Sequence, residues 1–88
     1  MEYYVYLLEC ADKSYYCGYT TNIGKRVKLH NTSKYGAKYT HTRRPVTLIY
    51  QEKYPSLSEA LRRERQIKRL SREKKNNLIS TGSISGTR

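Results

Sequence analysis

Five residues of this sequence carry the groups that phosphodiester hydrolysis requires. Such hydrolysis needs a base that deprotonates water, a cation beside the charged phosphate and a carboxylate that can hold a divalent metal. The candidates are Tyr6, Tyr16, Arg26, His30 and Glu64. A single glutamate suits Mg²⁺, with Mn²⁺ as the alternative, because Mg²⁺ keeps several waters and takes one or two carboxylates plus phosphate oxygens. The residue types therefore predict one metal ion, held by Glu64.

Glu64 stands out by its place on a helix that is predicted to begin near Leu57. At ~100° per residue, Glu64 falls near the middle of an apolar stripe, whereas Glu59 falls on the opposite side. The stripe consists of Leu57, Ala60, Leu61 and Ile67. A carboxylate on a buried stripe is costly unless it is paired or binds a cation. We therefore expect Glu64 to bind the metal, or Arg26 in its absence; a structural salt bridge is the competing interpretation.

The two tyrosines are expected on a β-hairpin. Residues 3–8 are rich in strand formers, residues 11–14 have the composition of a turn, and residues 15–20 resume strand character. Gly18, inside the second strand, indicates a bend or a close backbone approach. On pattern alone, Tyr6 and Tyr16 are more simply explained as ordinary aromatics of a sheet.

Arg26 and His30 are expected one turn apart on a helix over residues 23–30, with the capping signal at residues 21–22. Ile23 and His30 share one face of this helix, and Arg26 lies beside it. Arg26 is either a pocket-facing cation or a solvated helix charge. His30 is either a proton relay or phosphate contact, or a satisfied histidine at a helix end.

The remaining segments complete a small α+β domain. A loop is expected over residues 31–44 and a third strand over residues 46–50. Ser56 and Glu59 form the capping box of a second helix. The order strand, strand, helix, strand, helix predicts helices that cover a sheet.

The composition indicates a polyanionic partner. Among 88 residues, 18 are Lys or Arg and 7 are Asp or Glu, a net charge of +11. Such a charge on one small domain favours nucleic acid. A membrane partner is disfavoured because no segment approaches the roughly 18 apolar residues of a spanning helix. We expect one domain over residues 1–79 and a disordered tail over residues 80–88, which are rich in Ser, Gly and Thr.

The N-terminus and the cysteines favour a cytoplasmic protein. Residues 1–4 lack the charged and apolar regions of a signal peptide. Cys10 and Cys17 match no zinc pattern, so two free thiols in a reducing compartment are expected.

Two tripeptides resemble the signature of a known family. Tyr4-Val5-Tyr6 followed by Tyr16-Cys17-Gly18 resembles the paired motifs of the GIY-YIG nucleases, at the spacing of a hairpin. The match continues through Gly18-Tyr19-Thr20, Asn22, Arg26, His30-Asn31, Lys38-Tyr39-Thr40, Arg44-Pro45, Ala60-Leu61-Arg62-Arg63-Glu64 and Gln66-Ile67-Lys68. Over about residues 2–79 the chain is similar to the small stand-alone bacterial GIY-YIG proteins of uncharacterised function.

The resemblance implies a central three-stranded antiparallel sheet flanked by helices, and divalent-metal-dependent cleavage of DNA. By the same resemblance, Tyr6 and Tyr16 lie in the active site, where one acts as or supports the general base. Arg26 then lies near the phosphate and Glu64 binds the metal.

Some positions depart from the family pattern or align with it in two ways. Tyr4 and Cys17 replace the first Gly and the Ile of the family name, at positions that shape the strand. The family's downstream asparagine corresponds to either Asn76 or Asn77. Larger members attach a separate DNA-targeting domain, so a protein partner is expected to supply specificity here.

Basic side chains between tyrosines indicate a groove that follows a nucleic-acid backbone. The candidates are Lys38, Arg43, Arg44 and Lys68. Two functional hypotheses follow. The first is a metal-dependent endonuclease, acting on DNA rather than RNA, structure-selective and related to repair. The second is a catalytically silent nucleic-acid-binding accessory module, and the presence of Glu64 together with both tyrosines favours the first.

Overall fold

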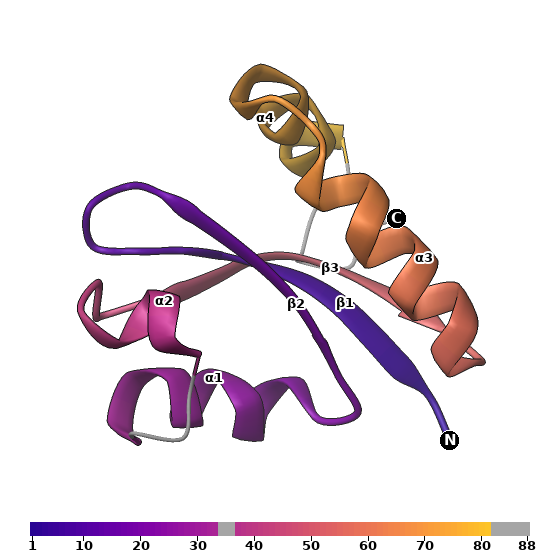
Figure 1. Ribbon diagram of the computed structural model, residues 1–88, viewed down its shortest axis with the longest axis horizontal. Coiled ribbons are helices and arrows are strands. Elements are labelled where there is room, and N and C mark those ends of the chain that lie inside the picture. Colours follow the sequence, from indigo (N-terminus) through magenta and orange to yellow (C-terminus); the bar gives the residue numbers. More distant parts are fainter. Residues whose placement is uncertain (34–36, 82–88) are drawn as a thin grey trace.

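The computed structural model describes residues 1–33 and 37–81 of the chain. Its elements are β1 (Tyr3–Glu9), β2 (Tyr15–Thr20), α1 (Ile23–Thr32), α2 (Lys38–His41), β3 (Thr47–Tyr54), α3 (Leu57–Lys68) and α4 (Arg72–Thr81). The strands form one antiparallel sheet in the order β2-β1-β3. Helices α1 and α2 lie on one side of this sheet and α3 and α4 on the other (Figure 1). The predicted α+β domain with a three-stranded antiparallel sheet is thus confirmed.

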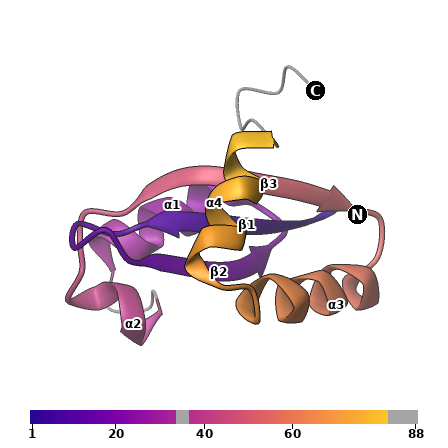
Figure 2. The same cartoon turned by 90° about the horizontal axis from the view of Figure 1, so that it is seen from above.

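The position of β1 at the centre of the sheet, with helices on both sides, explains why residues 3–8 are apolar on both faces. One core cluster joins Val5 and Leu7 to Ala60 and Ile67 of α3. A second cluster joins Tyr6, Leu8, Cys10 and Val46 on the side of α1. Because β1 is covered on both faces, its apolar residues do not alternate with polar ones. Seen from above, α4 crosses in front of the sheet and α1 lies behind it (Figure 2).

Local signals form the hairpin and start helices α1 and α3 where the sequence predicts them. In the β1–β2 turn, Asp12 Oδ1 accepts a hydrogen bond from the Ser14 amide at 3.0 Å, and Lys13 has φ 71°. The Asn22 side chain accepts from the Lys25 amide at 3.0 Å, and Ser56 Oγ accepts from the Glu59 amide at 3.3 Å. Each contact satisfies a backbone donor in a turn or at a helix start. The spacing of residues two or three positions apart was therefore enough to predict these elements.

Two helices were not predicted, so the observed order is β-β-α-α-β-α-α. Helix α2 lies inside the expected loop and has four residues, too few for a periodic pattern. Helix α4 carries few apolar residues, and Leu78 and Ile79 are the ones packed against the core. It runs to Thr81, past the expected start of the tail, and residues 82–88 lie outside the described part of the chain.

The structure differs from two further expectations, the end of the third strand and the burial of Leu57. Strand β3 continues to Tyr54, beyond the expected end at residue 50, because it pairs with β1 from Thr47 to Tyr54 with one irregularity at Ile49. Leu57 of the predicted apolar stripe is 40% exposed at the first turn of α3. Within the described residues, no helix is both long and apolar enough to cross a membrane.

Candidate active site

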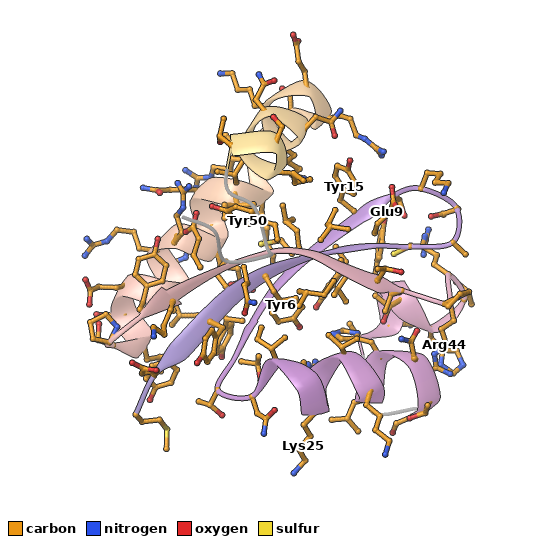
Figure 3. All side chains as sticks on the ribbon, turned by 180° about the vertical axis from the view of Figure 1, so that it is seen from behind. Tyr6, Glu9, Tyr15, Lys25, Arg44 and Tyr50 are labelled. Carbon is orange, nitrogen blue, oxygen red and sulfur yellow. The ribbon has the colours of Figure 1, made fainter. Side chains whose placement is uncertain are left out.

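A buried chain of hydrogen bonds links β1, α1 and α2. The Tyr6 hydroxyl lies 3.0 Å from His30 Nε2, and His30 Nδ1 lies 2.8 Å from Thr40 Oγ1. The three side chains are at most 1% exposed. Figure 3 shows Tyr6 reaching from the sheet toward α1. The family match includes Thr40 but did not indicate its contact with His30, because ten residues and a loop separate the two.

The direction of this chain follows from the single proton of the Thr40 hydroxyl. Thr40 Oγ1 donates to the Ala37 carbonyl at 2.9 Å, so it accepts from His30 Nδ1–H. His30 Nε2 is then the acceptor for the Tyr6 hydroxyl. The Ala37 amide also approaches Nδ1, but at 3.4 Å it is the weaker contact.

Burial sets the protonation of both groups. Burial, with the nearby positive charges of Arg26 and Arg44, lowers the pKa of His30 to about 4. Burial raises the pKa of Tyr6 to about 12, although Arg26 acts in the opposite direction. At neutral pH the imidazole is therefore uncharged, with Nε2 free to accept the hydrogen bond from Tyr6, and the phenol keeps its proton.

Tyr16 is the more accessible of the two motif tyrosines. It is half-buried, and its ring lies 5.2 Å from the ring of His30 and 6.5 Å from that of Tyr6. On its other side, Tyr39 stacks at 5.9 Å and carries the Arg43 guanidinium 4.0 Å above its ring. Of the two tyrosines, Tyr16 is therefore the one that water or substrate can approach.

Arg26 completes this group from α1. Its side chain is half-buried and close enough to Tyr6 and His30 to shift the pKa of each. Four of the five predicted catalytic residues thus gather on the α1 side of the sheet. Their roles stay a prediction.

Gly18 gives Tyr6 the space it occupies. The two residues are paired across β1 and β2. A Cβ on Gly18 would lie 2.6 Å from Tyr6 Oη and 3.1 Å from Tyr16 Cε2. The close approach that the sequence indicated is therefore that of the tyrosine ring, not of a second backbone.

We expect Gly18→Ala to lower the free energy of unfolding by about 1–3 kcal/mol, because the Tyr6 ring must move off its bond to His30. Urea denaturation measures this. Gly24→Ala is the control: a Cβ there meets only Asn22 Oδ1, at 3.8 Å, and α1 should gain roughly 0.5–1 kcal/mol. Equal behaviour of the two variants would show that the Tyr6 ring is not confined by Gly18.

Glu64 lies on α3, across the sheet from the Tyr6–His30 pair. Its carbonyl oxygen is 3.9 Å from Cys17 Sγ of the edge strand β2. Its side chain is 13% exposed, and Oε2 pairs with Lys68 Nζ at 3.4 Å. In the described residues the carboxylate thus pairs with Lys68 and forms no ion pair with Arg26, contrary to expectation. Lys68 lies one turn further along the same helix, whereas the sheet separates Glu64 from α1.

Glu64 can reach the tyrosines only around the edge of the sheet. Tyr16 and Cys17 are neighbours on β2 and point to opposite faces, so this strand has the tyrosine group on one side and Glu64 beside the other. No cluster of three or more His, Cys, Asp or Glu occurs in the described residues. A single carboxylate oxygen donor still fits Mg²⁺, which takes its other ligands from water and phosphate.

Comparison with known proteins decides the family. The family model for the GIY-YIG catalytic domain matches residues 2–77. The chain belongs to the GIY-YIG family. A UPF0213 protein of Syntrophus aciditrophicus is 58% identical over 76 residues, 86% of this chain and 87% of that protein. UPF0213 protein SH2523 of Staphylococcus haemolyticus is 55% identical over 89% of this chain and 94% of that protein.

Two solved structures share the GIY-YIG chain's fold. The solution NMR structure of UPF0213 protein BH0048 from Bacillus halodurans has a TM-score of 0.62 at 48% identity, covering 96% of this chain and 88% of that chain. The solution NMR structure of protein EF2693 from E. faecalis has a TM-score of 0.64 at 42% identity, covering 92% and 85%. The family suggests a nuclease with a nucleic-acid substrate, and GIY-YIG nucleases generally use divalent metal ions.

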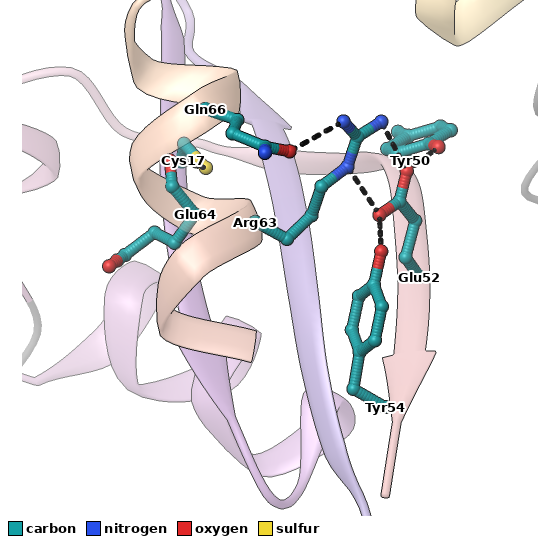
Figure 4. A network of polar contacts seen from close by, with 7 residues as sticks. All are labelled: Cys17, Tyr50, Glu52, Tyr54, Arg63, Glu64 and Gln66. Atoms are coloured by element: carbon teal, nitrogen blue, oxygen red, sulfur yellow. Dashed lines mark hydrogen bonds and ion pairs between the residues drawn. The ribbon is translucent and has the colours of Figure 1, made fainter. Parts of the chain in front are cut away.

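A second polar network fixes how this GIY-YIG domain holds α3. Arg63 Nε and Nη2 donate to the two carboxylate oxygens of Glu52 at 2.8 and 3.0 Å. The hydroxyls of Tyr50 and Tyr54 donate to the same carboxylate, the latter at 2.5 Å. Figure 4 shows Arg63 and Glu64 leaving α3 in opposite directions. The Arg63–Glu52 ion pair therefore fixes the orientation of α3 about its axis. In this orientation Glu64 points away from β3.

Glu52→Gln should lower the free energy of unfolding by about 1–3 kcal/mol at pH 7, because Arg63 would lose its counter-charge. Burial would raise the pKa of Glu52, but the hydrogen bonds from Arg63 and the two tyrosines outweigh it and hold the pKa below its ordinary value. The stabilisation is then complete above the unfolded pKa of ~4.3 and is lost as pH falls through the folded pKa.

Chemical denaturation between pH 3 and pH 7 tests this, and the difference between the parent and Glu52→Gln should narrow toward pH 3. Glu2→Gln is the control, because its pair with Lys53 at 3.6 Å is more than half exposed on both sides. A difference that is constant with pH would contradict the assigned pKa direction.

The four predicted nucleic-acid-binding residues differ in whether their side chains already form hydrogen bonds or ion pairs within the domain. Arg44 donates through Nε to the His30 carbonyl at 2.5 Å and through Nη2 to that of Ser33, so it caps α1. Arg43 pairs with Asp12 at 3.1 Å, and Lys68 pairs with Glu64. Lys38 is exposed at the start of α2.

The two asparagines that could correspond to the family's downstream asparagine differ in their contacts, and the choice between them stays open. Asn76 Oδ1 accepts from the Tyr15 hydroxyl at 2.5 Å. The Arg72 guanidinium lies 3.9 Å above the same tyrosine ring. These contacts tie α4 to β2, whereas the Asn77 side chain makes no hydrogen bond to a described residue.

Proposed function

We propose that this chain is a metal-dependent endonuclease that cleaves phosphodiester bonds in DNA. The observation that carries the proposal is the buried Tyr6–His30–Thr40 chain, which ends beside the accessible Tyr16 and the cation Arg26. A buried histidine that stays neutral and accepts a hydrogen bond from a phenol, beside an accessible tyrosine and a cation, is typical of a site whose groups have perturbed pKa values. It is useful where a proton has to be taken from water.

In the proposed reaction Tyr16 contacts the attacking water, because it is the more exposed of the two tyrosines. The water's proton passes inward to Tyr6 Oη as Tyr6 releases its own proton to His30 Nε2, so no phenolate has to persist. The guanidinium of Arg26 neutralises the charge that grows on the phosphate oxygens.

Substrate binding would also make His30 a better base. Burial is the main reason that the pKa of His30 lies near 4, and the charge of Arg26 adds to it. A phosphate beside Arg26 offsets that charge, and the pKa of His30 rises toward the working pH. Proton transfer is therefore favoured when substrate is present.

Glu64 is the residue that would hold one Mg²⁺ or Mn²⁺, with Lys68 displaced from its carboxylate. An ion held there would supply Lewis-acid stabilisation of the negative charge on the phosphate and the leaving oxygen. Two free, buried thiols, Cys10 and Cys17, support a reducing compartment such as the cytoplasm. We further propose that the substrate is a structured DNA met in repair, and that a protein partner supplies specificity.

The second candidate function is a silent nucleic-acid-binding module, favoured by the ion pair that occupies Glu64. One experiment separates the two: titration of Mg²⁺ and Mn²⁺ against plasmid, branched and single-stranded DNA. Metal-dependent nicking supports the nuclease. Binding without cleavage on every substrate would leave the silent module.

Both candidates require DNA binding that depends on salt. With a net charge of +11, affinity should fall by roughly 0.9 log units per log unit of salt for each phosphate neutralised on duplex DNA. Fluorescence anisotropy over a salt series in chelator measures the slope. A flat response would exclude a nucleic-acid partner for this basic surface.

A further inference from the structure

A hollow of about 450 Å³ opens on the α1 side of the sheet, at the end of β1 that precedes the active-site tyrosine. It is lined by Tyr4, Thr21, Asn22, Ile23 and Gln51. Its volume falls in the range of small-ligand pockets, roughly 300–1,000 Å³. Neither the proposed proton path nor the proposed metal ligand uses any of these residues.

The hollow adjoins the proposed site of cleavage. Tyr4 precedes Tyr6 by two residues, and on a strand residues two apart lie on the same face. Gln51 is the β3 residue paired with Tyr6 across the sheet. Ile23 begins α1, one turn before Arg26. A nucleotide in the hollow would therefore flank the phosphate beside Arg26.

The lining groups are free to bind a ligand. The hydroxyls of Tyr4 and Thr21 and the side-chain amide of Gln51 form no hydrogen bond with any described residue. Asn22 is the exception, because its side chain caps α1 through the Lys25 amide. An amide that can both donate and accept suits the edge of a base, and a tyrosine ring suits its face.

The uncharged lining of the hollow also favours a base over a phosphate. None of its five lining residues is charged. A phosphate subsite would be expected to offer Lys or Arg, as the surface near Arg26 does. An uncharged, flat, polar ligand fits the groups present.

We propose that this hollow binds one unpaired nucleobase of the nucleotide next to the cleaved bond. The inference rests on the proposed function for its place in the reaction. A paired base keeps its edge in the helix, so only an unpaired or extruded base can enter. The domain should therefore prefer DNA with an unpaired nucleotide beside the cut.

The test uses a DNA duplex with one unpaired adenine as a single-base bulge, the same duplex with an abasic bulge, and the fully paired duplex. Affinities are measured by anisotropy in chelator, so no cleavage is needed. The parent should bind the adenine bulge roughly fivefold or more tightly than the abasic bulge. Gln51→Leu and Thr21→Val should lose that preference. Thr47→Val, which removes an exposed hydroxyl at the other end of β3, should keep it.

Equal affinity of the parent for the two bulges would overturn the proposal, as would a preference that survives in Gln51→Leu and Thr21→Val. Cleavage assays on the same duplexes separate this failure from that of the proposed function. A base preference that Gln51→Leu removes, with no cleavage in Mg²⁺ or Mn²⁺, supports the hollow and rejects the nuclease. Cleavage with no base preference supports the nuclease and rejects base binding in the hollow.

Discussion

Glu64→Gln is expected to abolish metal-dependent cleavage, with a loss of roughly 100-fold or more in rate, because an amide is a much weaker metal ligand than a carboxylate. The free energy of unfolding in chelator should stay within about 0.5 kcal/mol of the parent or rise. The ion pair that is lost joins Glu64 to a Lys68 side chain that is 53% exposed, and such i,i+4 pairs contribute little.

Thermal and urea melts in chelator, run beside a plasmid-nicking assay, separate the two roles of Glu64. Glu73→Gln is the matched control, because it removes the same charge from an exposed position at the start of α4. If Glu64→Gln melted far below the parent and still cleaved DNA at the parental rate, Glu64 would be part of the scaffold and the metal assignment would be wrong.

Tyr16→Phe is expected to reduce the cleavage rate by roughly 10²–10⁴-fold while leaving DNA affinity and stability almost unchanged. The Tyr16 hydroxyl makes no hydrogen bond with any described residue, and the ring contacts with His30 and Tyr39 remain in the variant. The measurement is single-turnover cleavage, with anisotropy for binding and urea denaturation for stability.

Tyr6→Phe should give a different result, because Tyr6 is buried. It removes the donor to His30 Nε2 and leaves that nitrogen unsatisfied, so about 1–3 kcal/mol of stability should be lost along with activity. Tyr19→Phe, on the same strand as Tyr16 and 42% exposed, is the control that should change neither. Parental cleavage by Tyr16→Phe would rule out the role assigned to its hydroxyl.

The sequence by itself determined the features that depend on neighbours a few residues apart. Asn22 and Ser56 start their helices because each side chain satisfies a backbone donor three residues ahead. The Asp12 turn joins two strands for the same local reason. The helical period placed Glu64 on the side of α3 that turns inward, and its side chain is indeed largely buried. Its role as metal ligand stays a prediction.

Only the tertiary structure decided which of these residues meet. Thr40 lies in a segment without helical or strand periodicity, and the family match that includes it gave it no role. It orients His30 because the packing of α2 on α1 brings the two together. Arg44 caps α1 across fourteen residues of chain, a contact that no spacing indicated, and its binding of nucleic acid stays a prediction. Glu64 pairs with Lys68 and not with the expected Arg26 for the same reason. The helical period predicts which face of α3 carries Glu64, but it does not predict which residues of other elements lie near that face. Contacts between distant segments depend on how whole elements pack, and no local spacing encodes them.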